Sequence, residues 1–215
     1  MGALPLRQLK QHYLGLLGTT YLLIWLGLSI HPLYRQDWLL ENLLIFIALP
    51  IIAASIRWFR LSNLSYTLIF IFLSLHTLGA HYTYAEVPYD QWAKGLTGHT
   101  LSGALGWQRN HYDRLVHFCY GLMLAYPVRE MFMRFVAVRG FLAYFLPLDL
   151  TMSTSMLYEL LEWAAAELFG GDLGLAYLGT QGDVWDAQKD MALASLGALI
   201  AMLITAYLNY RKARR

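Results

Sequence analysis

Charged residues are scarce in this chain. They make up 14% of its 215 positions, whereas hydrophobic residues make up 58%. Soluble domains average about 25% charged and about 45–50% apolar residues. Residues 13–30, 43–56, 61–80 and 191–209 contain no Asp, Glu, Lys or Arg. Because a membrane-spanning helix needs about 20 mostly apolar residues, these runs exclude an ordinary soluble domain and predict an integral membrane protein.

Cysteine and the common catalytic motifs are also missing. Cys119 is the single cysteine, so no intramolecular disulfide can form, and its apolar surroundings favour a small buried side chain. The sequence contains no His-Glu-x-x-His, Gly-x-Ser-x-Gly, Walker or Cys-x-x-Cys motif, and thus lacks the signatures of the enzyme classes that these motifs define. The net charge is only +2 and the basic residues are dispersed, which argues against a nucleic-acid partner.

The apolar runs predict an all-α integral membrane bundle of about six transmembrane helices, in one polytopic domain over residues 1–215. The predicted ranges are His12–Ile30, Trp38–Ile56, Leu61–Ala80, Leu115–Phe135, Phe141–Phe169 and Asp190–Asn209. Pro147 in the fifth range predicts either a kink or a helix that protrudes from the bilayer. The first range is signal-like in composition, but the residues SIHP at positions 29–32 form a poor cleavage site, so we expect an uncleaved helix.

The positions of Lys and Arg predict the orientation. With the N-terminus inside, the inner segments hold Arg7, Lys10, Arg57, Arg60, Arg129, Arg134, Arg139, Arg211, Lys212, Arg214 and Arg215, and the outer segments hold Arg35, Lys94, Arg109, Arg114 and Lys189. This excess of inner basic residues predicts that both termini are cytoplasmic.

Acidic and aromatic residues gather on the outer side, where the two longest connections lie. The connections run from His81 to Arg114 and from Gly170 to Lys189. Every Asp and Glu except Glu130 and Asp149 falls in the outer half, Asp172 included. The aromatic residues of the connections are Tyr82, Tyr84, Tyr89, Trp92, Trp107, Tyr112, Tyr177 and Trp185. Such residues suit the lipid headgroup belt or the lining of a cavity that opens outward.

Ionisable residues also recur at helical spacing. Asp113 and His117 are four positions apart, and Asp183, Asp186 and Asp190 repeat at three and four, so each set lies on one helical face. Ser155, Glu159 and Glu162 repeat the pattern.

The face of the aspartates continues through small residues, namely Ala194, Gly197, Ala198 and Ala201. Small residues at this spacing let helices approach closely in lipid. We therefore expect the aspartates to point into the bundle, where a carboxylate must be paired, coordinated or hydrated.

Two sets of candidate site residues follow. The candidate catalytic residues are Asp113, Arg114, His117, Glu159 and Glu162, and the candidate metal ligands are His76, His81, His117, Asp183, Asp186 and Asp190. Mixed imidazole and carboxylate ligands suit zinc, iron or manganese. Without a metal, the same residues supply a general base and an orienting acid. We expect Asp113 or a glutamate to pair with Arg114, and His117 to face Glu162 and Asp186.

Plainer interpretations remain open for several of these residues. Asp183 follows Gly182 and suits a helix N-cap. His117 can be a hydrogen-bonded structural histidine, because one imidazole specifies no chemistry. Glu159 and Glu162 can neutralise Arg114 in a buried network.

Three stretches resemble a known family. They are YDRLVHF (Tyr112–Phe118), YELLEW (Tyr158–Trp163) and GDVWDAQKDMALASLGALIA (Gly182–Ala201). They resemble the YjdF-like family of bacterial inner-membrane proteins, and the resemblance covers essentially the whole chain. It implies a multi-pass protein of the bacterial inner (cytoplasmic) membrane.

More distantly, the layout is similar to that of VanZ-like membrane proteins, which are associated with low-level glycopeptide resistance. That family has an Asp-Lys/Arg-x-x-His-Phe element, then a Glu-Gln pair, then two aspartates and an asparagine that open the last helix. The matching residues are Asp113, Arg114, His117, Phe118, Glu162, Asp183 and Asp186, with Trp163 at the glutamine position and Asp190 at that of the asparagine. This resemblance implies a common helical core and a common polar site.

The sequence favours a membrane-embedded enzyme that acts at the outer leaflet on a lipid or lipid-linked envelope substrate. In this hypothesis His117 is a base or ligand, Glu159 and Glu162 are acids or ligands, and Arg114 contacts a phosphate or carboxylate. One alternative is a structural or partner-binding membrane protein, in which the polar residues form a closed salt-bridge network. A transporter is less favoured, because Asp149 is the single inner-half candidate for an ion pathway.

Overall fold

The computed structural model describes residues 6–171, 174 and 178–215, and the regular structure in these residues is entirely helical. Six helices are long. They are α1 (Leu6–Ser29), α2 (Arg35–Trp58), α3 (Asn63–His81), α6 (Tyr112–Phe135), α7 (Leu142–Phe169) and α9 (Asp186–Ala213). The six helical ranges predicted from the apolar runs are thus confirmed, with differences at their ends. α6 and α9 begin earlier than predicted, so Asp113 and Asp186 lie in first helical turns.

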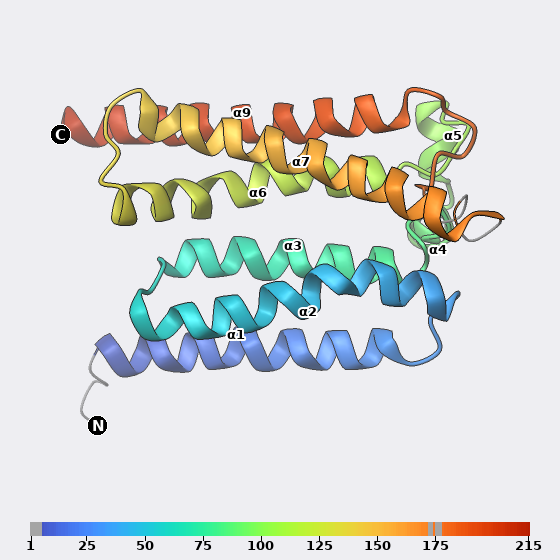
Figure 1. Ribbon diagram of the computed structural model, residues 1–215, viewed down its shortest axis with the longest axis horizontal. Helices are drawn as coiled ribbons and strands as arrows, with labels where there is room; N and C mark the ends of the chain where they lie inside the picture. The colour runs from blue at the N-terminus through green and yellow to red at the C-terminus, as the bar shows by residue number, and fades with distance from the viewer. Residues whose placement is uncertain (1–5, 172–173, 175–177) are drawn as a thin grey trace.

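The long helices form two groups of three that run along a common direction (Figure 1). α1, α2 and α3 form one group and α6, α7 and α9 form the other, and α3 packs on α6 between them. The start of α1 and the C-terminus lie at one end of the bundle. The opposite end carries the short helices α4 and α5, and we call it the α4–α5 end.

Three helices, α2, α3 and α9, are long and apolar enough to cross a membrane by length and composition. α7 contains Pro147 and is nevertheless one helix from Leu142 to Phe169. Pro147 therefore does not end this helix.

The first long connection contains more regular structure than the sequence indicated. α4 (Tyr89–Thr97) and α5 (Leu101–Leu105) lie within it. Gly98 and Gly106 follow them with φ angles of 80° and 70°, a left-handed conformation that glycine adopts without steric cost. In the second connection, Asp172 and Tyr177 lie outside the described residues.

Glycines bring α6 and α9 into close contact. A Cβ atom on Gly121 would overlap the carbonyl oxygen of Ala194, and one on Gly197 would overlap that of Phe118. Ala194, Ala198 and Ala201 are buried along the same face of α9, as the small-residue pattern predicted. Because the backbones touch, the residues one or two turns toward the α4–α5 end, His117 and Asp190, are held against each other.

Candidate functional site

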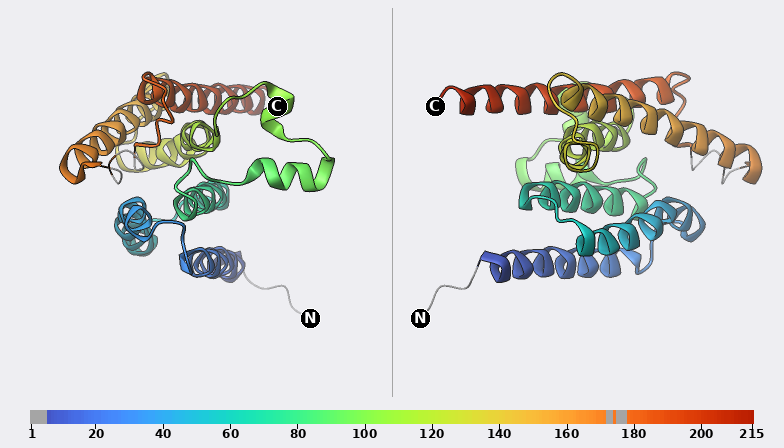
Figure 2. Two further views of the ribbon diagram at one scale, coloured as in Figure 1. Left: turned by 90° about the vertical axis from the view of Figure 1, so that its right-hand side faces the viewer. Right: turned by 60° about the vertical axis from the view of Figure 1, so that its left-hand side comes forward.

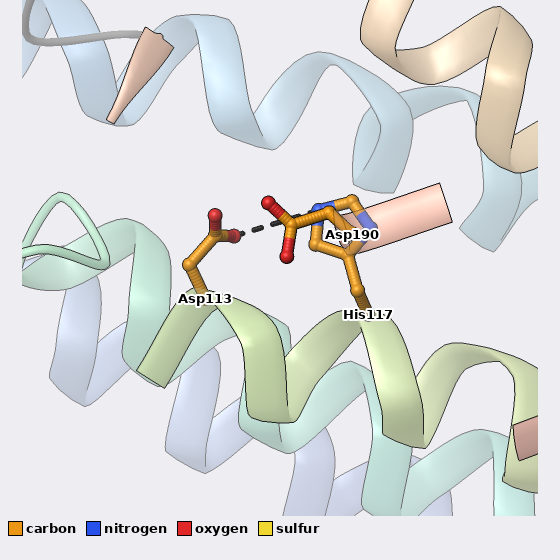
Figure 3. Close-up of side chains that lie close together, drawn as sticks. All are labelled: Asp113, His117 and Asp190. Carbon is orange, nitrogen blue, oxygen red and sulfur yellow. Dashed lines mark ion pairs between the residues drawn. The ribbon is translucent and has the colours of Figure 1, made fainter. Parts of the chain in front are cut away.

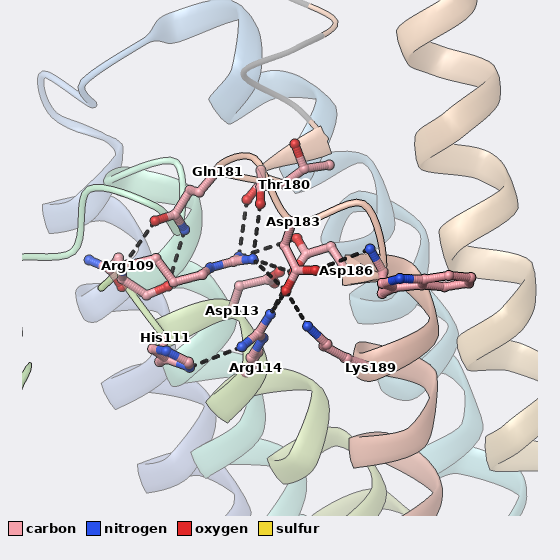
Figure 4. A network of polar contacts seen from close by, with 12 residues as sticks. Arg109, His111, Asp113, Arg114, Thr180, Gln181, Asp183, Asp186 and Lys189 are labelled. Atoms are coloured by element: carbon pink, nitrogen blue, oxygen red, sulfur yellow. Dashed lines mark hydrogen bonds and ion pairs between the residues drawn. The ribbon is translucent and has the colours of Figure 1, made fainter. Parts of the chain in front are cut away.

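An ion-pair network occupies the start of α9. Arg109 donates to both oxygens of Asp186, with Nη1 2.5 Å from Oδ1 and Nη2 3.2 Å from Oδ2. Arg114 donates to Asp183 and, at 3.2 Å, to Asp186. Lys189 Nζ lies 2.6 Å from Asp183 Oδ2. Figure 4 shows the three cations converging on the two aspartates, and we call these five residues the rim network.

The rim network is closed by backbone groups. Arg109 also donates to the carbonyl oxygens of Thr180 and Gly179, at 2.9 and 3.3 Å. Asp183 Oδ1 accepts a hydrogen bond of 3.1 Å from the backbone N–H of Trp185. Lys189, this N–H group and Arg114 hold the pKa of Asp183 well below its ordinary value. The network therefore fastens the connection after α7 to the start of α6.

The expected pairing of Arg114 with Asp113 or a glutamate is wrong. α9 begins with Asp186, and the turn before it brings Asp183 within reach of the Arg114 guanidinium. Two carboxylates engage Arg114, and His111 Nδ1 lies 3.4 Å from its Nη1. Burial, Arg114 and Arg109 lower the pKa of His111 from its ordinary 6.5, so the neutral ring is favoured here.

A second cluster lies about one helical turn deeper and consists of Asp113, His117, Glu159 and Asp190, which we call the inner cluster. α6 supplies Asp113 and His117, α7 supplies Glu159, and α9 supplies Asp190. His117 Nε2 lies 3.5 Å from Asp113 Oδ1 and 3.5 Å from Glu159 Oε1. Asp190 points toward the same place (Figure 3). All four were predicted from the sequence as site residues. Asp113 and Glu159 were candidate catalytic residues, Asp190 was a candidate metal ligand, and His117 was both.

Glu162 lies beside the inner cluster. It is within hydrogen-bonding reach of Tyr158 and of Glu159. Tyr158 also donates a hydrogen bond of 3.1 Å to Glu41 Oε2 on α2. A chain of side chains thus links α7 to α2 near the α4–α5 end.

The structure places two of the proposed metal ligands elsewhere. His76 Nε2 lies 3.0 Å from the carbonyl oxygen of Glu41. A carbonyl only accepts, so this nitrogen carries the proton, and the other ring nitrogen accepts from the Tyr84 hydroxyl. Burial raises the pKa of Tyr84 well above its ordinary value and keeps that hydroxyl protonated. Both nitrogens of His76 are therefore occupied.

His81 is further from the two clusters. Its Nδ1 donates a hydrogen bond of 2.7 Å to the carbonyl oxygen of Leu28 on α1. Its ring packs edge-on against Tyr82, with centroids 4.5 Å apart. This histidine joins α3 to α1.

A cavity of about 580 Å³ extends from the inner cluster along the bundle between the two groups of helices. Asp113, His117, His76 and Tyr84 line its α4–α5 end. Aliphatic and aromatic residues of α2, α3 and α6 form most of the remaining wall. The sequence predicted a polar chamber that opens outward, whereas this cavity is apolar along most of its length. A smaller hollow of about 360 Å³, near Arg109 and α4, is separate from it.

Several residues that build the site were not predicted from the sequence. Arg109 was counted as a basic residue of a connection, yet it makes the bidentate contact to Asp186. A signal for it existed, because three aspartates share one helical face and require partners there, and Arg109 lies only a few residues before α6. No sequence pattern pointed to the link between Glu41 and Tyr158, since these residues lie on helices far apart in the chain.

Comparisons with known proteins place the chain in a family. Residues 13–211 match the family model described as "Predicted membrane protein (DUF2238)". The chain is 39% identical over 197 residues to the inner membrane protein YjdF of Escherichia coli K12, across 91% of this chain and 89% of that protein. No solved structure matches the chain significantly. The expected YjdF-like resemblance and the inner-membrane location are confirmed, while the VanZ-like resemblance stays a prediction. The chain belongs to the DUF2238 family of predicted membrane proteins.

Proposed function

We propose that all six long helices cross the inner membrane, with both termini in the cytoplasm. The start of α1 and the C-terminus lie at the same end of the bundle, as an even number of crossings requires. The segments at that end carry most of the Lys and Arg residues, and such an excess marks the cytoplasmic side. The α4–α5 end and both polar clusters then lie near the outer leaflet.

In this arrangement the protein is a membrane-embedded enzyme that acts on a lipid or lipid-linked envelope substrate. The cavity is the observation that carries this proposal. Its volume of about 580 Å³ falls within the roughly 300–1,000 Å³ of ligand sites. Apolar walls that end at Asp113 and His117 suit a hydrocarbon chain with a polar head group.

The cavity is long as well as apolar. The α6 residues that line it run from Asp113 to Met131, which corresponds to about 27 Å at 1.5 Å per helical residue. This length approaches the roughly 30 Å thickness of the bilayer hydrocarbon core. It therefore favours a long chain, such as that of a polyprenyl lipid, over the acyl chain of one leaflet.

We expect a lateral entry for such a chain between α2 and α7, beyond the hydrogen bond of Tyr158 to Glu41 that joins these helices near the α4–α5 end. α2 packs on α3, whereas α7 packs on α6 and α9. The end-on view in Figure 2 shows α2 and α7 on the same side of the α3–α6 pair. Both helices contribute residues to the cavity wall, among them Leu44 and Thr154. A lipid can enter from the bilayer here without crossing the polar rim.

His117 is the candidate general base for the head group. Its Nε2 lies between two carboxylates, which stabilise an imidazolium once the nitrogen has taken a proton. Glu159 and Glu162 are the candidate acids. Arg114 is unsuited to binding a phosphate, because Asp183 and Asp186 already engage it.

Filling the cavity tests the proposal. Leu124 lines the cavity, and Leu124→Trp should exclude a hydrocarbon chain from it. Leu203→Trp on α9 is the matched control, since Leu203 is 60% exposed and belongs to no part of the cavity wall. The lipids that co-purify with each protein are extracted and identified by mass spectrometry.

We expect a long-chain lipid with the unmodified protein and with Leu203→Trp, and its loss with Leu124→Trp. Equal lipid content in all three proteins would contradict lipid binding in the cavity. For catalysis, cells that produce the unmodified protein and cells that produce His117→Ala should differ in their envelope lipids. Identical lipid profiles would reduce the protein to a binding role.

A structural role is the second candidate, and the rim network favours it. That network is closed, with every cation paired, as a purely structural polar cluster would be. If this candidate is correct, His117→Ala and Leu124→Trp leave both the bound lipids and the envelope lipids unchanged.

A further inference from the structure

The inner cluster collects metal-ligand atoms from separate helices in one place. The atoms offered by Asp113, His117 and Asp190 all lie within 4.8 Å of one another, and Figure 3 shows the three side chains pointing toward a common centre. Asp113 and His117 occupy positions i and i+4 of α6, the spacing that places two ligands on one helical face. Asp190 closes the group from α9.

The distances around His117 fit a small divalent ion. Two ligands bound tetrahedrally at about 2.0–2.1 Å lie roughly 3.3 Å apart. His117 Nε2 lies 3.5 Å from Asp113 Oδ1 and 3.5 Å from Glu159 Oε1. These separations exceed good hydrogen bonds, yet they are close to the spacing of two ligands on one ion. Glu159 is not one of the three residues whose atoms all lie within 4.8 Å of one another, but it offers a further donor from α7 beside the imidazole.

Two of these carboxylates each have one buried oxygen without a hydrogen-bond partner. Asp190 is 2% exposed, and in the described part of the chain its Oδ1 accepts no hydrogen bond. Glu159 Oε1 is buried and likewise accepts none. A buried carboxylate oxygen without a partner carries a large desolvation cost. Both oxygens belong to the group of donors around His117.

The carboxylates of the inner cluster are compensated by Arg109 and Arg114 only at longer range, without direct ion pairs. Within the described residues, no Lys or Arg lies within ion-pair distance of Asp113, Glu159 or Asp190. The nearby basic side chains of the rim network are bound to Asp183 and Asp186 instead. One imidazole therefore faces three carboxylates, and a divalent cation would balance them.

We propose that Asp113, His117, Glu159 and Asp190 form a binding site for a divalent transition-metal ion. One imidazole with three carboxylates suits Mn²⁺, Fe²⁺ or Zn²⁺. His76, His81, Asp183 and Asp186 are not ligands of this ion, because other groups occupy them. The site does not require a lipid substrate, so metal binding and lipid binding are tested separately. An ion bound at His117 Nε2 would, however, replace the general-base role proposed above for that nitrogen.

Metal content tests the site. The detergent-purified protein is stripped with a chelator, incubated separately with Mn²⁺, Fe²⁺ under anaerobic conditions, or Zn²⁺, passed through a desalting column and analysed by plasma mass spectrometry. Asp190→Asn removes a ligand. Asp37→Asn is the matched control, because Asp37 is 1% exposed and its Oδ1 also lacks a partner, but it lies on α2 outside the donor group.

We expect one equivalent of at least one of these metals in the unmodified protein and in Asp37→Asn, and at least tenfold weaker binding by Asp190→Asn. His117→Gln provides a second ligand variant in case Asp190→Asn does not fold, and it should show the same loss. Less than a tenth of an equivalent of every metal in the unmodified protein would overturn the proposal. Equal loss in Asp37→Asn would overturn the assignment of the ligands.

Discussion

The rim network and the inner cluster are neighbours to which α6 and α9 both contribute, and their charges are balanced in different ways. In the rim network Asp183 and Asp186 bind three cations. In the inner cluster Asp113, Glu159 and Asp190 share one histidine. Asp186 and Asp190 are both buried, at 4% and 2% exposure. Burial alone therefore does not distinguish the carboxylates of the two clusters, whereas the presence of a Lys or Arg partner does.

Breaking the rim network should cause the largest loss of stability. Asp186→Asn removes the bidentate partner of Arg109 and leaves that buried guanidinium with a single, longer ion pair, to Asp183 Oδ2 at 3.7 Å. Losing one member of a buried ion pair costs about 3–5 kcal/mol. Denaturant titration in detergent micelles, followed by circular dichroism, measures the loss. Asp183→Asn should cost less, because its partner Lys189 has a side chain that is 49% exposed. Equal stability of Asp186→Asn and the unmodified protein would contradict the structural role of the rim.

Separating α6 from α9 should have the next largest effect. Gly121→Ala places a Cβ atom against the Ala194 carbonyl, and overpacking of this kind costs about 1–3 kcal/mol. It should also weaken metal binding, because it moves His117 away from Asp190. Gly18→Ala on α1 is the control, since its Cβ meets no atom within 4 Å. If Gly121→Ala is as stable as Gly18→Ala, the close approach of α6 and α9 is wrong.

Removing a carboxylate of the inner cluster should change the stability of the protein in the opposite direction from breaking the rim network. In metal-free protein, Asp190→Asn replaces a buried carboxylate, one oxygen of which has no partner, with a neutral amide that can donate to the neighbouring carboxylates. An unsatisfied buried group costs about 1–3 kcal/mol. The variant should therefore be as stable as the unmodified protein, or more stable by up to that amount. The same denaturant titration measures this change. A loss comparable to that of Asp186→Asn would show that the two regions do not differ.

Acidification should produce the smallest effect, through His111. Its pKa lies below the ordinary 6.5 because of burial, Arg114 and Arg109, although Asp186 and Asp183 partly oppose the shift. The unfolded chain therefore binds a proton at this residue at higher pH than the folded protein does. Stability should fall as the pH drops below about 6.5, and His111→Gln should remove that part of the pH dependence. Melting temperatures at pH 7.5 and 5.5 measure it, and identical pH dependence in the two proteins would exclude His111 as its source.

Much of the fold follows from the sequence, because lipid imposes a simple rule on it. Long stretches without charge, such as residues 191–209, must be helical to satisfy their backbone groups. The small residues that continue the aspartate face predicted the packed side of α9, and Gly197 indeed contacts α6. Short helices such as α4 lack a long apolar run, so the sequence did not reveal them.

The candidate site was predictable as a set of residues but not as a set of pairs. Helical spacing placed Asp183, Asp186 and Asp190 on one face, and all three do lie in the two clusters. Which of them meets a cation depends on where Arg109 reaches from a connection, and spacing within a helix carries no such information. For the same reason His76 was grouped with the metal ligands, although Tyr84 and the Glu41 carbonyl occupy its ring.

The most direct measurement of the contrast between the clusters is the melting temperature of metal-free protein with and without added Mn²⁺, Fe²⁺ or Zn²⁺. An ion at 100 times its dissociation constant stabilises the folded state by about 2.7 kcal/mol. One of these ions should therefore raise the melting temperature of the unmodified protein and of Asp186→Asn, but not that of Asp190→Asn. The inner cluster is not a cation site if no ion raises the melting temperature of the unmodified protein, or if the melting temperature of Asp190→Asn rises as much. The contrast with the rim network would then have another cause.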